Sequence, residues 1–156
     1  MDSNENALRD GNRMQISTFY INETLYGIDI NKVQEINKLS ELTAVPLAPP
    51  FVKGVVNLRG RIVTVIDLGY KLTRRRTAET EETKNIIVES KGEYLGLMVD
   101  RIWDVVQTEA DSINPPPANI GGIQGKLFKG VIQRDRELVG ILDIERILAD
   151  ETIDRD

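Results

Sequence analysis

Apolar residues recur along this chain in short, partly alternating runs, a pattern typical of half-buried β-strands. Several runs come in pairs that a short polar turn separates, at Asn22-Glu23 in one pair and at Arg59-Gly60 in another. The pattern predicts a mainly β structure with strands in the segments MQISTFYI, TLYGIDI, VKGVVNL, RIVTVIDL, KNIIVES, YLGLMVDRIWDVV, FKGVIQ and ELVGILDI.

Other segments interrupt this pattern. The prolines of residues 45–50 exclude regular structure, because each proline fixes its own φ and biases the residue before it away from the helical region. Residues 113–126 are rich in proline and glycine and are expected to form a long loop. The polar residues 1–13 are expected to be a disordered tail, and residues 151–156 a second tail. A short amphipathic helix is expected near the C-terminus, with Asp143 as its N-cap.

The chain contains an internal repeat. The segment KGVVNLRGRIVTVIDLGYKL, which starts at Lys53, aligns without a gap with KGVIQRDRELVGILDIERIL, which starts at Lys129, so the offset is 129 − 53 = 76 residues. An upstream pair repeats more loosely, YGIDINKVQEI with LGLMVDRIWDV, and in this pair Gly27 aligns with Gly96. The repeat indicates two related β-units.

Each such unit, at about 60–70 residues, buries little surface by itself, so the two are expected to share a core. We predict subdomains at roughly 24–83 and 84–138 within one domain of residues 14–150, each closed as a small five-stranded barrel that hides its strand edges. The N-terminal strand and the C-terminal segment are candidates to cross between the subdomains. A single sandwich is the structural alternative.

The composition of the chain excludes several classes of function. The 156 residues include no cysteine and no histidine, so disulfides, thiolate chemistry and the usual general base near neutral pH are excluded. A net charge of −5 argues against nucleic-acid binding, and no run reaches the ~18–20 apolar residues that cross a bilayer. We expect a non-enzymatic interaction module with no catalytic residue, no metal and no cofactor, and with other proteins as its partners.

Individual polar residues have competing explanations. Asp67 and Asp143 occupy equivalent places in the two repeats, each before an expected helical turn, so helix capping explains them better than metal binding or catalysis. The sequence NLRG occurs in one repeat while the other has QRDR, which favours a specific charged contact for Arg59 over a simple turn role. The run at 74–76 is either a basic docking patch or, as glutamates follow it, a solvated loop. For Trp103, core or inter-barrel packing is favoured over an interface anchor.

Several linked segments together resemble one known family. These segments are YGIDINKVQEI, VPLAPPFVKGVVNLRGRIVTVIDL, LGLMVDRI and FKGVIQRDRELVGILDIERIL, in that order and spacing, and they resemble the CheW family from about Gln15 to Ala149. The VNLRG core with its flanking KG and VIDL is highly specific. The resemblance implies two SH3-like β-barrel subdomains around a shared core, with short helical turns and a short C-terminal helix.

The resemblance also implies partners. CheW proteins couple the cytoplasmic tips of methyl-accepting chemoreceptors to a CheA-like histidine kinase, and they assemble with CheA regulatory domains in rings. The expected place is therefore the cytoplasm, at membrane-associated receptor arrays and without direct membrane insertion. This chain has neither a phosphoacceptor histidine nor room for an ATP-binding or receiver domain, so the stand-alone adaptor is the member that fits.

Family sites transfer to matching positions. The receptor-binding residues that the resemblance implies lie in a groove between the subdomains and are Val33, Ile36, Asn57, Arg59 and Val99. Glu35 and Gly54 match positions for receptor or kinase coupling. Residues 113–126, which the resemblance places near a kinase or ring contact, depart from the family pattern.

Two alternative functions stay open. The same adaptor fold serves equally in a kinase system outside chemotaxis, such as surface motility or development. A small β-barrel that binds nucleic acid is the alternative from a different class, although the acidic charge and the 5% aromatic content oppose it.

Overall fold

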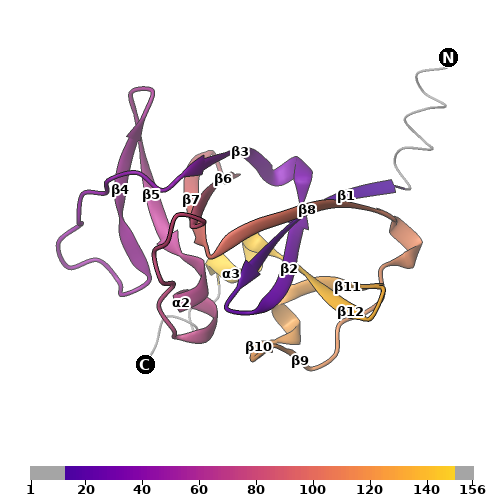
Figure 1. Cartoon of the computed structure of the whole chain (residues 1–156). Helices are drawn as coiled ribbons and strands as arrows, with labels where there is room; N and C mark the ends of the chain where they lie inside the picture. Colours follow the sequence, from indigo (N-terminus) through magenta and orange to yellow (C-terminus); the bar gives the residue numbers. More distant parts are fainter. Residues whose placement is uncertain (1–12, 150–156) are drawn as a thin grey trace, which may run out of the picture.

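Two five-stranded sheets make up most of the structure, a computed structural model that describes residues 13–149 (Figure 1). The first sheet consists of β1 (Arg13–Ile21), β2 (Thr24–Asp29), β8 (Arg101–Glu109), β11 (Phe128–Arg134) and β12 (Glu137–Leu142), in the order β11-β12-β2-β1-β8. The second sheet consists of β3 (Val33–Lys38), β4 (Val52–Leu58), β5 (Arg61–Asp67), β6 (Lys84–Ser90) and β7 (Glu93–Val99), in the order β3-β6-β7-β5-β4. The expected mainly β fold is confirmed.

The internal repeat is visible in the strand pairing. The hairpin β4–β5 is the repeat of the hairpin β11–β12, and each hairpin continues into a parallel pair, β5 with β7 in one sheet and β12 with β2 in the other. In each sheet an isolated bridge pairs one residue with the outer strand of the hairpin. Thr43 pairs with Val55 of β4, and Asn114 pairs with Val131 of β11. The two sheets are therefore two copies of one strand arrangement.

The sheets divide the chain differently from the ranges 24–83 and 84–138. Strand β2 lies with the C-terminal strands in the first sheet, whereas β6 and β7 lie in the second. The N-terminal strand β1 pairs with β8, so both ends of the described chain contribute to one sheet. Hydrophobic alternation shows which residues form strands, but a parallel pair joins strands that are distant in sequence, so alternation does not show which strands pair.

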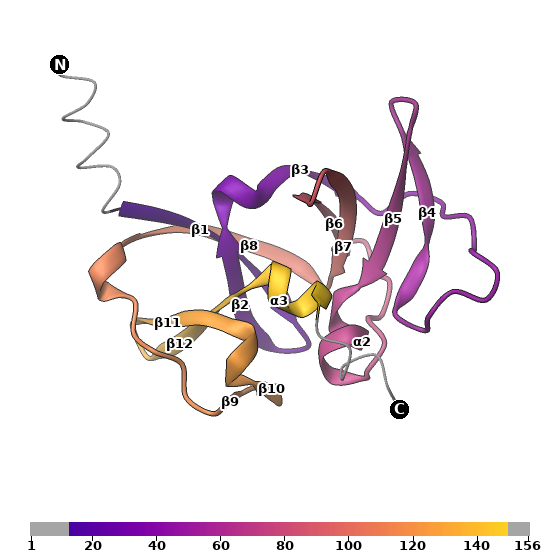
Figure 2. The same ribbon diagram turned by 180° about the vertical axis from the view of Figure 1, so that it is seen from behind.

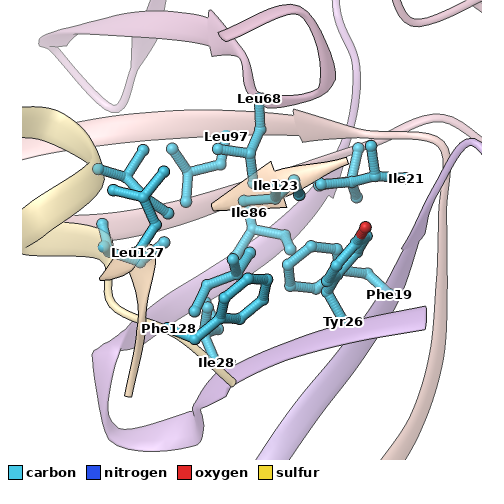
Figure 3. Close-up of a cluster of buried hydrophobic side chains, with 14 of the residues drawn as sticks. Phe19, Ile21, Tyr26, Ile28, Leu68, Ile86, Leu97, Ile123, Leu127 and Phe128 are labelled. Atoms are coloured by element: carbon cyan, nitrogen blue, oxygen red, sulfur yellow. The ribbon is translucent and has the colours of Figure 1, made fainter. Parts of the chain in front are cut away.

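A buried apolar cluster joins the two sheets. This central cluster combines Phe19, Tyr26 and Ile28 from the first sheet with Ile86 and Leu97 from the second, and all five are at most 1% exposed (Figure 3). The short helices α2 (Leu68–Thr73) and α3 (Ile144–Ala149) add apolar side chains to it, and α3 lies between the sheets in both views (Figures 1 and 2). The expected shared core is thus present.

Each sheet also encloses a smaller cluster of its own. In the first sheet the cluster includes Ile16, Val139 and Ile141, and in the second it includes Val63 and Met98. A sheet that curls around its own apolar residues is a small barrel rather than one layer of a sandwich. The two-barrel expectation therefore holds, and the sandwich alternative does not.

Residues 113–126 are more ordered than a long loop. They contain a hairpin of β9 (Asn119–Ile120) and β10 (Ile123–Gln124), which turns at two glycines of positive φ, and they lead into the 3-10 helix η3 (Gly125–Leu127). The Tyr26 hydroxyl donates to the Ile120 carbonyl at 3.3 Å and anchors this hairpin to the central cluster. At the termini, the expected tails lie outside the described residues except for Arg13, which begins β1.

Candidate functional site

The sequence-predicted site residues Val33, Glu35 and Ile36 lie on β3, an edge strand of the second sheet. Val33 pairs with Val88 and Ile36 pairs with Ile86, so three steps along β3 match two steps along β6. This bulge turns Val33 and Ile36 to the same face, which is the face of the central cluster. Val33 packs against that cluster, while Ile36 remains 39% exposed.

The first sheet carries the same bulge on its own edge strand. On β8, Ile102 pairs with Phe19 and Val105 pairs with Ser17, again three steps against two. Ile102 packs against the central cluster as Val33 does, and Val105 is 51% exposed. Sequence reasoning missed these two residues as site candidates. The repeat that aligns Gly27 with Gly96 also aligns Val33 with Ile102 and Ile36 with Val105.

Arg59 and Glu35 form an ion pair across the second barrel. Arg59 occupies the turn between β4 and β5, and its guanidinium donates from Nη2 to Glu35 Oε2 on β3. Both residues were assigned to the site separately, so the structure brings together two candidates that are 24 positions apart. The Arg59 side chain is nevertheless 73% exposed, and its other N–H groups are available to a partner.

This pair changes the titration of both groups. The hydrogen bond from the Arg59 guanidinium holds the pKa of the Glu35 carboxyl below its ordinary value. The same hydrogen bond and the charge of Glu35 raise the pKa of Arg59. The carboxylate is therefore ionised at neutral pH, and the pair persists there.

The turn itself shows why Gly60 occurs in only one repeat. Arg59 and Gly60 both have positive φ, 52° and 82°, and the Asn57 side chain accepts a hydrogen bond from the Gly60 N–H at 2.9 Å. In the other repeat Asp135 has a φ of 56°, while Arg136 does not adopt a positive φ. Backbone geometry therefore accounts for the glycine, so the difference between the two turn sequences does not by itself indicate a binding role for Arg59. The evidence for such a role is the exposed ion pair of Arg59.

A shallow cavity of about 260 Å³ lies beside the ion pair. It is bounded by Glu35, Arg59, Arg61, Tyr94 and the apolar Leu58 and Val63. The Arg61 guanidinium lies 4.1 Å from the centre of the Tyr94 ring, a cation–π contact. The cavity therefore offers two guanidinium groups and one carboxylate at a partly apolar surface, which suits charged and apolar contacts with a protein.

Two of the predicted site residues are not at the surface. Val99 is 0% exposed and belongs to the central cluster, because β7 is an interior strand and Val99 faces the core. Gly54 is also buried, at a β-bulge with a φ of 155°. A Cβ there would lie 2.7 Å from the Thr43 carbonyl oxygen, so Gly54 maintains the fold beneath the site and has no side chain to contact a partner.

The aspartates of the repeat serve the fold. Asp67 Oδ1 accepts from the Tyr70 N–H at 3.0 Å, and Asp143 Oδ1 accepts from the Arg146 N–H at 3.1 Å, so both cap helices. Trp103 differs from expectation. It is 47% exposed on β8 and does not pack in the core.

The family model for the CheW-like domain matches residues 15–152 of this sequence. The chain belongs to the CheW-like family. The match covers both barrels and the site on β3 and the β4–β5 turn.

Curated relatives agree with this membership. The CheW-like chain is 31% identical over 148 residues to the chemotaxis protein CheW of Treponema pallidum (strain Nichols), which covers 92% of this chain and 86% of that protein. It is 34% identical over 133 residues to the chemotaxis protein CheW of Klebsiella aerogenes, covering 85% of this chain and 80% of the relative. Protein FrzA of Myxococcus xanthus is a more distant relative, 26% identical over 133 residues.

A solved structure supports the fold directly. The scaffolding protein TtCheW from Thermoanaerobacter tengcongensis matches with a TM-score of 0.79 and 33% identity, and the match covers 86% of each chain. Within residues 13–149 of the CheW-like chain, no helix is both long and apolar enough to cross a membrane.

Proposed function

We propose that this CheW-like chain is a non-enzymatic scaffold that couples the cytoplasmic tips of chemoreceptors to a CheA-like histidine kinase. The observation that carries the proposal is the family match over residues 15–152, which includes the NLRG turn with Arg59 exposed. The relatives named as chemotaxis proteins and the structural neighbour named as a scaffolding protein support the same reading.

The proposed receptor contact uses the bulged edge strands. Val33, Ile36, Ile102 and Val105 present apolar side chains toward or beside the central cluster from both sheets. An amphipathic helical tip binds by laying its apolar face on such a surface. Asn57 and Arg59 lie at the neighbouring turn, where they supply polar contacts to the same partner. Glu35 acts through Arg59, because its carboxylate already holds the guanidinium.

A kinase contact and ring assembly with CheA regulatory domains belong to the same proposal. The adaptor would then act in the cytoplasm at receptor arrays. A role in a related kinase system outside chemotaxis is the second candidate function. The similarity to protein FrzA, which is not named as a chemotaxis protein, supports this candidate.

The proposal is tested by purifying the tagged chain from its native cytoplasm and identifying the captured proteins by mass spectrometry. We expect a CheA-like kinase and chemoreceptors, and we expect Arg59→Ala to reduce the receptor fraction. Capture of a CheA-like kinase with receptors of another pathway would support the second candidate. Recovery of neither kinase nor receptors would contradict both.

A further inference from the structure

Four arginines gather around the end of α2 and the beginning of β8, away from the site on β3. Helix α2 lies beside one end of β8 in both views (Figures 1 and 2). A Cβ placed on Gly69 of α2 would lie 3.4 Å from Ile21 at the end of β1, which confirms that the helix packs close to the first sheet. We call this region the arginine surface, and it consists of Arg74, Arg75, Arg76 and Arg101 with the rings of Tyr20, Tyr70 and Trp103.

Aromatic rings hold the guanidinium groups of this surface. Arg101 lies 3.9 Å from the centre of the Tyr20 ring and 5.5 Å from that of Trp103, and the two rings meet edge to face at 5.6 Å. Arg76 lies 4.6 Å from the centre of the Tyr70 ring. Stacked guanidiniums lose less side-chain entropy when they bind, because their rotamers are already restricted.

One carboxylate, Asp100, directly precedes β8 in this region. Burial raises the pKa of Asp100, while the Asn22 N–H, at 2.5 Å from its carboxylate, and the charges of Arg101 and Arg75 act in the opposite direction. Arg101 follows Asp100 directly in the chain, and Arg75 comes from the connection that follows α2. Neither Arg75 nor Arg101 forms an ion pair with a carboxylate of residues 13–149.

Within residues 13–149, Arg75, Arg76 and Arg101 form no ion pair with the downstream glutamates. Glu79 is the nearest of them in sequence to the arginine run, and its carboxylate pairs with Lys53 of β4 at 2.7 Å. The Glu79 carboxylate is therefore engaged away from the arginine run, and Arg75 and Arg76 lie in an exposed connection without regular structure. In a chain with a net charge of −5, Arg75, Arg76 and Arg101 bring three positive charges to this region.

We propose that the arginine surface binds an acidic segment of a partner protein. Guanidinium groups bind carboxylates through paired hydrogen bonds, and arginine, tyrosine and tryptophan are the residues that dominate protein interfaces. The exposed Trp103 would receive an apolar residue of the segment, and Arg75 and Arg101 would receive carboxylates. Four arginines within an acidic chain neutralise few phosphates, which disfavours nucleic acid as the occupant.

Trp103 is the single tryptophan of the sequence, so its emission reports binding without a label. The probe is a synthetic peptide of glutamate and leucine, and the matched peptide carries glutamine in place of glutamate. We expect the acidic peptide alone to change Trp103 emission, with an affinity that falls as salt is raised. Arg75→Glu and Arg101→Glu should each weaken binding by roughly tenfold or more.

Arg134→Glu is the matched control, since Arg134 is exposed on the β11–β12 hairpin and outside this surface. It should leave the peptide affinity unchanged, as should Arg59→Ala, which separates this surface from the proposed receptor site. Circular dichroism of every variant checks that each one folds. Equal binding of both peptides, equal loss in the Arg134→Glu control, or binding only of phosphatidylserine vesicles or a single-stranded oligonucleotide would overturn the proposal.

Discussion

Arg59 combines a left-handed backbone with a side chain that is 73% exposed and an ion pair to Glu35. A non-glycine residue at positive φ is locally unfavourable, and an exposed ion pair gives little stability in return. Local structure alone therefore gives no reason for arginine at this turn. Binding to a partner gives one, because the guanidinium keeps donors free while Glu35 holds it in place.

We predict that Arg59→Ala leaves the thermal unfolding curve nearly unchanged and weakens receptor binding by roughly ten- to a hundred-fold, the range for a lost charge-assisted hydrogen bond. Calorimetry and binding to receptor-containing membranes measure the two effects. Arg134→Ala, on the equivalent hairpin of the other barrel, is the control and should change neither. An unfolded Arg59→Ala protein, or one with intact binding, would assign Arg59 to the fold.

The Glu35 pair also predicts a pH dependence. Since Arg59 lowers the pKa of the folded Glu35 carboxyl below its ordinary value of 4.5, the pair's contribution is complete above pH 4.5 and disappears as the pH falls through the folded pKa. Carboxyl NMR titration should show the Glu35 pKa rising toward 4.5 in Arg59→Ala. An unchanged Glu35 pKa in that variant would show that the ion pair does not form in solution.

At the scale of elements, the sequence predicted most of the strands and the C-terminal helix because each has a local signal, but β3 was not among the predicted strands, and β7 and β8 were predicted as one run. The turns at Asn22-Glu23 and Arg59-Gly60, the helical turn after Asp67 and the cap at Asp143 all occur as predicted. The β9–β10 hairpin was missed, since strands of two residues have no period and this hairpin depends on the tertiary contact with Tyr26. Local patterns predict local elements, and tertiary contacts decide the rest.

The two helix caps allow a comparison within one molecule. Asp67 is 1% exposed and, besides capping α2, accepts from the N–H and the hydroxyl of Thr77 at 3.0 and 2.7 Å. Asp67→Ala should therefore lower the free energy of unfolding by about 2–4 kcal/mol, because it removes a cap and leaves buried donors unpaired.

Asp143→Ala, at the equivalent position of the other repeat, should cost only about 1 kcal/mol, the typical value for a lost cap. Urea unfolding of both variants provides the measurement. Equal losses would mean that the contacts to Thr77 add nothing to stability.

For the whole molecule, the sequence predicted two barrels, a shared core and a candidate crossing of the N-terminal strand, but the subdomain boundary at 83/84 does not match the division of strands between the sheets. The first sheet takes strands from 13–29 and 101–142, so a cut between 83 and 84 divides the contributors to both sheets. Sequence and structure contribute different parts of the candidate site. Motif positions identified Glu35 and Arg59, whereas only the strand register shows that Val99 faces the core and that Ile102 and Val105 match Val33 and Ile36.

One cooperative unfolding transition should follow from the central cluster. Ile86→Ala, which truncates a side chain that is 0% exposed, should lower the free energy of unfolding by about 2–5 kcal/mol and shift probes in both sheets together. Hydrogen exchange of amides in β1 and β5 reports on the two sheets separately. Two well-separated melting transitions, or a loss confined to the second sheet, would contradict a shared core.

The central claim is that this chain links receptors to a kinase, and co-sedimentation measures that link most directly. Membranes that contain the receptor are mixed with a CheA-like kinase, with or without the purified chain, and then pelleted. We predict that the kinase pellets with the receptors only when the chain is present. The Arg59→Ala variant at the same concentration should bring less kinase into the pellet. A kinase that pellets equally with and without the chain would contradict the account.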